Sequence, residues 1–445
     1  MAVQYYTNSA GQFQKREIFP ADTIPGSITA RPSQTASTTG IYGFGVAITP
    51  SSCYLLAQMD PHQRTQLLRY IYTQEGLNLS IGRLCVGASD YSAELYTYDD
   101  VPFDTELKYF SVERDEKYVI PMIQEILKIR PDLYLYSSPW SPPGWMKTGG
   151  SICGGHMREE FVECYVEYYI KYLKAYATHG IQIRALTPQN EPETHQEGRM
   201  PACIWNPETE ARFIRCLRKR LDEEDMDIKI WMWDYRFTGI DRVLWSLDNI
   251  EGLAQCCTGV AFHYYQGIIE QTVKLHDHYP QLEMHFTEGG PRLYDNYDTD
   301  WCKWGIMITK ALTCGYQSFT GWNLLLDETG GPNIGPYFCG GLATLHSITG
   351  ELNYSGQSVA MHHIAPYINR ESKIYPLITD EVAHNPMFAY PKVAALMVGF
   401  LIENADSTVC VMVNPDKNKK QVRFLAKEQW WYVELLADSI STIVL

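Results

Sequence analysis

From about residue 40 the chain repeats one pattern: a short apolar run, a loop rich in Gly, Ser, Pro, Asn or Trp, and an amphipathic segment with helical spacing. Short apolar runs bounded by such loops are typical of buried parallel strands. Eight runs fit this description, at Ile41–Phe44, Leu77–Arg83, Leu133–Ser137, Ile181–Leu186, Ile228–Trp233, Val260–His263, Leu282–Thr287 and Ser318–Asn323. Eight strands that alternate with helices over about 300 residues predict an α/β fold, a parallel (β/α)8 TIM barrel.

Three of the intervening helices can be placed from their faces and ends. Glu159–Thr178 carries five aromatic residues at three- and four-residue spacing, which predicts a helix with one buried face. Asn206, followed by a proline and a glutamate, has the features of a helix start. Trp301–Cys314 is followed by Gly315, a residue that is common just past a helix end.

The pattern changes after residue 365, where turns rather than helices separate the apolar runs. These runs are Val393–Ile402, Thr408–Val413, Gln421–Leu425, Trp431–Leu436 and Ile440–Leu445. They predict an antiparallel β-sandwich, and the N-terminal segment is expected to join it because chain ends often lie close together. A length of 445 residues would allow about three domains. We predict two, a barrel over 36–362 and a β-sandwich of 1–35 and 363–445.

Composition and charge exclude several classes of protein. Hydrophobic residues make up 45% and charged residues 20% of the chain, as in ordinary globular proteins. The net charge is 37 − 52 = −15, which disfavours nucleic acids and anionic membrane surfaces as partners. The longest apolar run, Val393–Ile402, is well short of the roughly 20 residues that a membrane-spanning helix needs.

Neither a secretion signal nor a cofactor motif is recognisable. The N-terminus lacks the charged and apolar pattern of a signal peptide, and the twelve cysteines include no C-x-x-C pair, so we expect a cytoplasmic protein with free thiols. The histidine pairs His276 with His278 and His362 with His363 lack a third ligand at useful spacing. No metal and no cofactor are therefore expected.

Two glutamates follow predicted strands. Glu191 lies in an Asn-Glu-Pro sequence after the fourth strand, and Glu288 lies at the end of the seventh. The carboxyl ends of the strands form the active-site face of such a barrel, so both side chains are expected at one rim. Glycoside hydrolysis requires such a pair, because one carboxyl group protonates the leaving oxygen and the other attacks the anomeric carbon or activates water. Either residue alone could be a solvated loop acid; together they predict a catalytic pair.

Further short motifs occur in a fixed order along the chain. They are Gly43-Phe44-Gly45, Ser89-Asp90-Tyr91-Ser92, Tyr96-Thr97-Tyr98, Ser138-Pro139-Trp140-Ser141-Pro142-Pro143-Gly144-Trp145-Met146-Lys147, Asn190-Glu191-Pro192, Phe262-His263-Tyr264-Tyr265, Thr287-Glu288, Gly321-Trp322-Asn323-Leu324, Gly330-Gly331-Pro332-Asn333 and Ser439-Ile440-Ser441-Thr442. This ordered set resembles glycoside hydrolase family 30, the family of the glucosylceramidases, and covers nearly the whole chain from about residue 40.

The resemblance implies a retaining mechanism in which Glu191 is the general acid/base and Glu288 is the nucleophile. It also implies a set of residues around the sugar at the non-reducing end: Arg83, Asp90, Trp140, Asn190, His263, Tyr265 and Trp322. Their chemistry agrees with this role. Asn190 can donate to the sugar 2-OH, and Asp90 can accept from two hydroxyl groups.

The remaining members of this set have plausible tasks and also ordinary alternatives. Trp140 and Trp322 can present flat apolar faces to a sugar ring, or they can be packing at the rim. Arg83 and a Tyr265 hydroxyl near the nucleophile would keep it ionised. His263 fits the site and equally fits a hydrogen-bonded core histidine. Asp234-Tyr235, after the fifth strand, departs from the Asp-His or Asp-Asp of many relatives and is expected to reshape the leaving-group side.

We therefore predict a retaining exo-β-glycosidase, a β-glucosidase of the glucosylceramidase type, that acts on a small glycoside, an oligosaccharide or a glycolipid. β-Xylosidase, β-fucosidase and endo-β-1,6-glucanase activities would use the same two glutamates and stay open. The alternative from another class is a non-catalytic carbohydrate-binding protein, in which one of the two carboxylates would be expected to be lost. The sequence leaves the oligomeric state undetermined.

Overall fold

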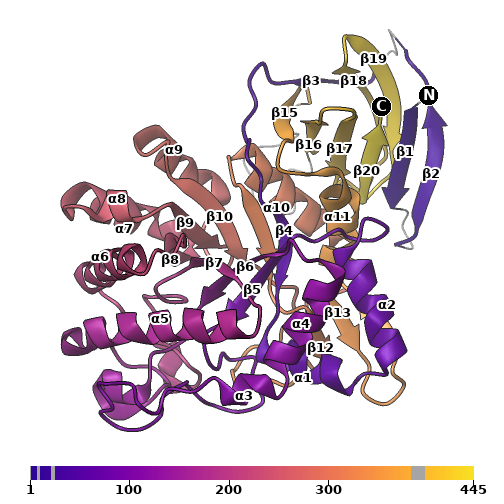
Figure 1. Cartoon of the computed structure of the whole chain (residues 1–445). Coiled ribbons are helices and arrows are strands. Elements are labelled where there is room, and N and C mark those ends of the chain that lie inside the picture. Colours follow the sequence, from indigo (N-terminus) through magenta and orange to yellow (C-terminus); the bar gives the residue numbers. More distant parts are fainter. Residues whose placement is uncertain (1, 8–10, 22–25, 382–395) are drawn as a thin grey trace.

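Eight strands close into a barrel, and a second sheet packs beside it (Figure 1). The computed structural model describes residues 2–7, 11–21, 26–381 and 396–445. The barrel strands are β4 (Gly43–Ala47), β5 (Ile81–Cys85), β6 (Tyr134–Ser138), β7 (Ile183–Leu186), β8 (Lys229–Arg236), β9 (Gly259–His263), β10 (Glu283–Glu288) and β11 (Ser318–Gly321). Each pairs in parallel with the next, and β11 closes the barrel on β4. The predicted barrel is confirmed, strand for strand.

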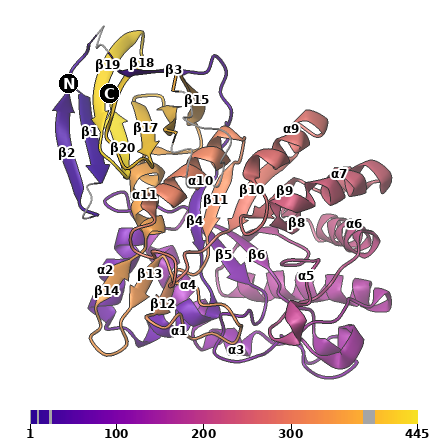
Figure 2. The same cartoon turned by 180° about the vertical axis from the view of Figure 1, so that it is seen from behind.

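Helices surround this barrel (Figure 2). They are α1 (Pro50–Gln58), α2 (Pro61–Tyr72), α3 (Glu113–Glu116), α4 (Val119–Ile129), α5 (Val162–Thr178), α6 (Pro207–Glu223), α7 (Ile240–Asn249), α8 (Leu253–Cys256), α9 (Lys274–His278), α10 (Trp301–Thr313) and α11 (Gly356–Ile364). The three predicted helices are confirmed as α5, α6 and α10. The start of α6 follows from Asn206, whose side chain accepts a hydrogen bond from the Thr209 N–H at 2.7 Å. None of the described helices is long and apolar enough to span a membrane.

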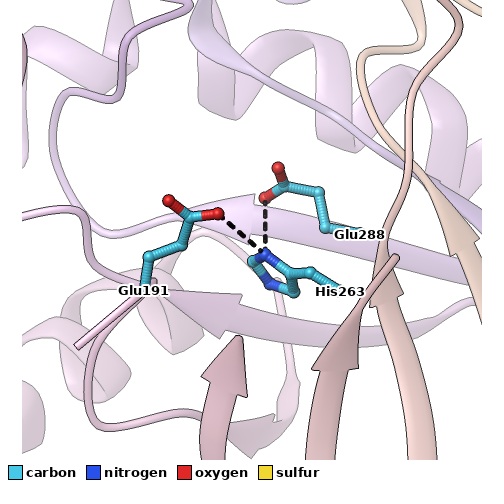
Figure 3. A group of neighbouring side chains, drawn as sticks. All are labelled: Glu191, His263 and Glu288. Atoms are coloured by element: carbon cyan, nitrogen blue, oxygen red, sulfur yellow. Dashed lines mark hydrogen bonds and ion pairs between the residues drawn. The ribbon is translucent and has the colours of Figure 1, made fainter. Parts of the chain in front are cut away.

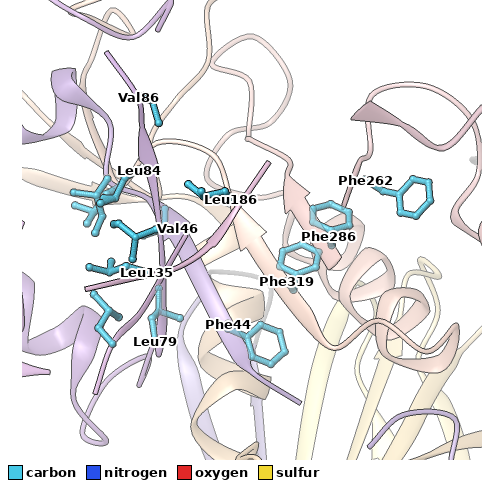
Figure 4. Close-up of a cluster of buried hydrophobic side chains, with 14 of the residues drawn as sticks. Phe44, Val46, Leu79, Leu84, Val86, Leu135, Leu186, Phe262, Phe286 and Phe319 are labelled. Carbon is cyan, nitrogen blue, oxygen red and sulfur yellow. The ribbon is translucent and has the colours of Figure 1, made fainter. Parts of the chain in front are cut away.

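The main core lies between the barrel strands and their helices. Figure 4 shows part of it, in which the outward-facing strand residues Phe44, Phe286 and Phe319 lie close together. The Phe286 and Phe319 rings stack with centroids 4.1 Å apart. Inside the barrel the side chains of Tyr136 and Trp231 fill the space between the strands. The barrel is therefore packed in its lower part, and its open end lies at the carboxyl ends of the strands.

A nine-stranded sheet forms the second unit. Its strands are β1 (Ala2–Thr7), β2 (Phe13–Ile18), β3 (Ile28–Pro32), β15 (Lys373–Thr379), β16 (Val398–Glu403), β17 (Thr408–Asn414), β18 (Lys420–Ala426), β19 (Gln429–Leu435) and β20 (Ser439–Val444). The order is β19-β18-β3-β15-β16-β17-β20-β1-β2. Strand β15 pairs with β16 through one half and with β3 through the other, and apolar side chains from both ends of the sheet form one enclosed cluster.

This arrangement confirms the predicted β-sandwich and the contribution of the N-terminal strands. The pairing is antiparallel throughout except between β18 and β3, which run parallel. The predicted strand over Val393–Ile402 corresponds to β16, although its first three residues lie outside the described residues. Strand β15 was not predicted, nor was the small sheet that follows β11, formed by β12 (Leu325–Asp327), β13 (Ala343–Leu345) and β14 (Leu352–Tyr354).

One face of the nine-stranded sheet packs against helices α10 and α11 (Figure 1). Gly305 in α10 allows close approach, because a Cβ at this position would lie 2.8 Å from Cδ1 of Ile440 in β20. The division into residues 36–362 and the two flanking segments stays a proposal. The boundary at residue 362 would fall inside α11.

Candidate active site

The structure places Glu191 and Glu288 at the same rim of the barrel. Glu288 is the last residue of β10, and Glu191 follows β7 in a turn with a φ of +52°. Figure 3 shows both carboxylates directed toward one ring nitrogen of His263, the last residue of β9. His263 Nδ1 is 3.3 Å from Glu191 Oε1 and 3.9 Å from Glu288 Oε2. An oxygen of each glutamate and a nitrogen of His263 all lie within 4.8 Å of one another.

Two donors hold the carboxylate of Glu288. Arg83 Nη1 donates to Oε2, and the Tyr265 hydroxyl donates to Oε1 at 3.1 Å. Arg83 is fully buried inside the barrel, so water does little to weaken its attraction for the carboxylate. The two contacts orient Glu288 and balance its charge, and both come from residues that the sequence placed near it.

Arg83 also fixes Asn190. Its Nη2 donates to Asn190 Oδ1 at 2.8 Å and to Asp234 Oδ2 at 2.9 Å. Because the amide oxygen of Asn190 faces the guanidinium, its amide nitrogen is the end that is left to donate to a ligand. Burial alone would lower the pKa of Arg83, but the charges of Asp234 and Glu288 raise it. Arg83 is therefore a permanent cation below the site.

Asp234 in β8 was not among the predicted site residues, although it connects several of them. Its two oxygens interact with Arg83, Ser138, Thr187, His263 and Thr287. Burial alone would raise the pKa of Asp234, but the Arg83 charge and the His263 contact hold it below its ordinary value. Asp234 is thus a buried anion that anchors the two cations of the site from beneath.

A bulge in β8 aims Asp234 into the barrel. Trp233 and Asp234 have φ values of +77° and +54°, and the register against β9 shifts between Trp233 and Tyr235. Such a bulge inserts one residue and redirects the side chain, which is common next to active sites. The bulge also holds the turn that carries Glu191, because the Asp234 carbonyl accepts a hydrogen bond from the Glu191 N–H at 3.1 Å. One irregularity therefore positions both the buried anion and the turn that carries Glu191.

His263 carries a positive charge at neutral pH. Burial alone would lower its pKa, but the Glu288 charge and hydrogen bonds to Asp234 and Glu191 raise the pKa of His263 to about 9. Both ring nitrogens of an imidazolium are donors, which suits a contact with a carboxylate on either side. The grouping of Glu191, His263 and Glu288 has a geometry that could hold a metal ion. The contacts of His263 with Glu191 and Asp234 at hydrogen-bond distance account for the same grouping.

The far wall of the site is formed by Asp90 and two tryptophans. Asp90 is buried, and its Oδ1 has no hydrogen-bond partner within the described residues. Burial, followed by the charges of Glu288 and Glu191, raises the pKa of Asp90 well above its ordinary value. The Trp140 and Trp322 rings stack on each other at 5.1 Å and 19°, and Arg83 lies over both. This wall offers an unsatisfied acceptor beside two aromatic rings that line the cavity.

These residues line a cavity of about 350 Å³. Its lining contains Asp90, Trp140, Asn190, Glu191, Tyr265, Glu288 and Trp322, while the buried Arg83 and His263 support it from below. Three further residues that were not predicted also line it: Gln196, Arg292 and Tyr337. Each lies in a loop whose path depends on tertiary contacts. The only sequence signal is that Gln196 and Arg292 follow shortly after the two glutamates.

Comparison with curated proteins gives two kinds of relative. A putative glucosylceramidase 3 of Caenorhabditis elegans is 31% identical over 312 residues, which cover 66% of this chain and 60% of that protein. An endo-1,6-beta-D-glucanase of Neurospora crassa is 28% identical over 345 residues, which cover 74% and 70%. The matches thus span about 60% to 70% of the length of these relatives.

Solved structures share the whole architecture. SrfJ from Salmonella typhimurium aligns with a TM-score of 0.88 and 24% identity, covering 100% of this chain and 99% of SrfJ. The endo-beta1,6-glucanase BT3312 aligns with a TM-score of 0.85 and 22% identity, with the same coverage. At these identities the likeness shows the fold. The family follows from sequence, since residues 41–346 match the TIM-barrel domain of glycosyl hydrolase family 30. The chain therefore belongs to glycosyl hydrolase family 30.

Proposed function

We propose that the chain is a retaining β-glucosidase that releases a terminal β-linked glucose by double displacement. The observation that carries the proposal is the pair of carboxylates, Glu191 and Glu288, which have oxygens within 4.8 Å of each other across one cavity. Retaining glycosidases hold their carboxyl groups about 5–5.5 Å apart, whereas inverting ones leave about 6.5–9.5 Å for a water molecule. An approach of one oxygen from each glutamate to within 4.8 Å is compatible with the retaining range, which supports direct attack by one carboxylate.

In the first step Glu288 attacks the anomeric carbon, and the bond from that carbon to the leaving oxygen breaks. Glu191 gives its proton to this oxygen, so that the aglycone departs as an alcohol. In the second step Glu191, now a carboxylate, takes a proton from water. As it loses this proton, the water oxygen attacks the anomeric carbon and Glu288 leaves as a carboxylate. The sugar is released with its configuration retained.

The surrounding residues would bind and orient the glucosyl unit. The free acceptor of Asp90 suits sugar hydroxyl groups, and the amide nitrogen of Asn190 suits the 2-OH, a contact that strengthens in the transition state. Trp140 and Trp322 would contact the apolar C–H surface of the ring. Tyr265 and Arg83 would hold Glu288 in line for attack. His263 would position the two carboxylates relative to each other.

The names of the relatives offer two leaving groups, a ceramide and a further glucose unit of a β-1,6-glucan. The sequence alone favoured the glucosylceramidase type. The lining on the Glu191 side of the cavity, with Gln196, Arg236 and Tyr337, is polar, which suits the hydroxyl groups of a saccharide better than a hydrocarbon chain. Endo-β-1,6-glucanase activity is therefore the second candidate function.

The decisive experiment compares Glu288→Gln with the wild-type chain on an aryl β-glucoside, while NMR follows the anomer of the product. We expect at least a thousandfold loss of kcat in the variant, and β-glucose as the first product of the wild type. Glu208→Gln, at an exposed position of α6, serves as the control. Undiminished turnover by Glu288→Gln, or α-glucose as the first product, would overturn the proposal. Gentiobiose and glucosylceramide then distinguish the two leaving groups.

A further inference from the structure

Arg292 lies at the mouth of the cavity, four residues after Glu288. Its guanidinium is placed over two aromatic rings, 5.3 Å from the centroid of Tyr265 and 5.6 Å from that of Tyr337. The side chain is partly buried there. Contact with two rings restricts the movement of the guanidinium, which lines the cavity.

The guanidinium of Arg292 has no hydrogen bond and no ion pair with any of the described residues. Its neighbours at the rim behave differently. Arg236 pairs with Glu193 at 2.8 Å and bonds Gln266 at 2.8 Å, and Arg199 pairs with Glu197 at 3.1 Å. A partly desolvated cation without a partner costs free energy in the free protein, and a ligand that supplies the missing acceptor removes that cost.

Arg292 stands on the leaving-group side of the cavity. The Tyr337 hydroxyl donates to Gln196 Oε1 at 2.7 Å, and Gln196 Nε2 donates to Glu191 Oε2 at 2.8 Å. The ring beneath Arg292 is therefore two hydrogen bonds away from the proposed acid/base. Since that residue must reach the glycosidic oxygen, the groups next to it face the unit beyond that oxygen, and the glucosyl unit lies toward Asp90 and the tryptophans.

The charges around Arg292 indicate which chemical group the leaving group carries. The buried cations Arg83 and His263 are balanced by the anions Asp234 and Glu288, since the proposed acid Glu191 carries a proton before the first step. Arg292 then leaves a local positive charge at the mouth of a protein whose net charge is −15. A neutral hydroxyl group would satisfy one donor and none of this charge. A carboxylate matches the planar fork with two parallel hydrogen bonds and balances the charge as well.

We propose that Arg292 binds a carboxylate on the leaving group, as in a uronic acid unit linked to the terminal glucose. This inference rests on the proposed β-glucosidase function and adds the chemical class of the aglycone. Arg292 would then determine which aglycone is preferred, by binding the acidic one at the mouth of the cavity, and would leave the reaction at the glucosyl unit unchanged.

The test uses two aryl glucosides that differ only in charge, 3-carboxyphenyl and 3-carboxamidophenyl β-D-glucoside. For each enzyme the ratio of kcat/KM for the acid to kcat/KM for the amide is measured, because this ratio cancels effects of a variant on folding and on the shared chemistry. We expect this ratio to fall about tenfold in Arg292→Gln relative to wild type, which is the size of effect expected when one hydrogen bond between charged groups is lost. In Arg292→Lys the ratio should fall less, because the positive charge is kept. Arg199→Gln, which removes an exposed cation that is already paired with Glu197, should keep the wild-type ratio.

Equal ratios in the wild type and Arg292→Gln would overturn the inference while leaving the β-glucosidase function standing. Binding of the same two glucosides to the Glu288→Gln variant, measured by calorimetry, tests the inference without any turnover. Tighter binding of the acid that is lost in the Glu288→Gln, Arg292→Gln double variant supports it. Equal binding of acid and amide rejects it, whether or not the chain hydrolyses either compound.

Discussion

At the scale of single residues, His263 connects the charge balance of the site to pH. Its pKa in the folded chain, about 9, lies above the ordinary value of 6.5. The imidazolium therefore stabilises the folded state fully below pH 6.5, and this contribution is lost as the pH rises through 9. Its size is on the order of 3 kcal/mol.

We therefore expect the difference in unfolding free energy between wild type and His263→Gln to be largest near pH 6 and to narrow steadily toward pH 9.5. Urea unfolding at several pH values measures it. His62→Gln, at an exposed position of α2, should show no such trend. A difference between wild type and His263→Gln that stays constant over this range would contradict the assigned charge state.

The residues of the site divide by how they could be predicted. Glu191, Glu288 and His263 follow directly from the strand ends, because parallel strands of a barrel deliver their last residues to one face. Asp234 could not be found in this way. It owes its inward direction to a bulge, and a period of two along a strand gives no sign that one residue has been inserted. The roles of all these residues stay proposals until variants are measured.

At the scale of elements, helix α6 supports the bulge in β8 from outside the barrel. Glu210 in α6 is almost fully buried, and its Oε1 accepts a hydrogen bond from the Trp233 N–H at 2.9 Å. Its Oε2 accepts one from Arg242 at 2.7 Å, and Arg242 in turn pairs with Glu193 in the loop after Glu191. The helix thus fixes both the bulge and the loop without touching the cavity.

Glu210→Ala should therefore lower kcat about tenfold or more, with a smaller effect on KM, since misplaced groups lose transition-state contacts first. It should also cost about 3–5 kcal/mol of stability, because Arg242 and a backbone N–H lose a buried partner. Steady-state kinetics and urea unfolding measure the two effects. Glu208→Ala, on the exposed side of the same helix, is the matched control. Equal kcat values for the two variants would argue against a positioning role.

The strands that could be predicted from the sequence differ in burial and length from those that could not. The barrel strands are mostly apolar and mostly buried, so each one shows as a short apolar run. Strand β15 is only partly buried and contains Pro376, a residue that argues against a strand in the middle of a sheet. The strands β12 to β14 have three residues each, too few to show any period.

At the scale of the whole molecule, the barrel and the sheet share one apolar core. Phe400, Val411 and Ile440 from the sheet belong to the same buried cluster as the side chains between the barrel and its helices. Uncovering a large apolar side chain costs about 1.5–3 kcal/mol, and a whole domain is stable by only about 5–15 kcal/mol. The barrel is therefore expected to depend on the sheet for its stability.

A chain reduced to residues 36–362 should accordingly aggregate or bind a hydrophobic dye, whereas the full chain should unfold in one transition that near-ultraviolet circular dichroism and tryptophan fluorescence report alike. Size-exclusion chromatography of both chains provides the comparison. A soluble, folded and active 36–362 fragment would show instead that the barrel is an independent domain.

The pairing of β1 with β20 has a consequence for the order of events during synthesis. Val3 lies opposite Val444, so β1 leaves the ribosome about 440 residues before the strand β20 with which it pairs. At about 5–20 residues per second this delay lasts roughly 20 to 90 s. The barrel strands emerge during that interval in the order in which they pair. The barrel can therefore assemble progressively, while the sheet that covers α10 and α11 closes only after β20 has been made.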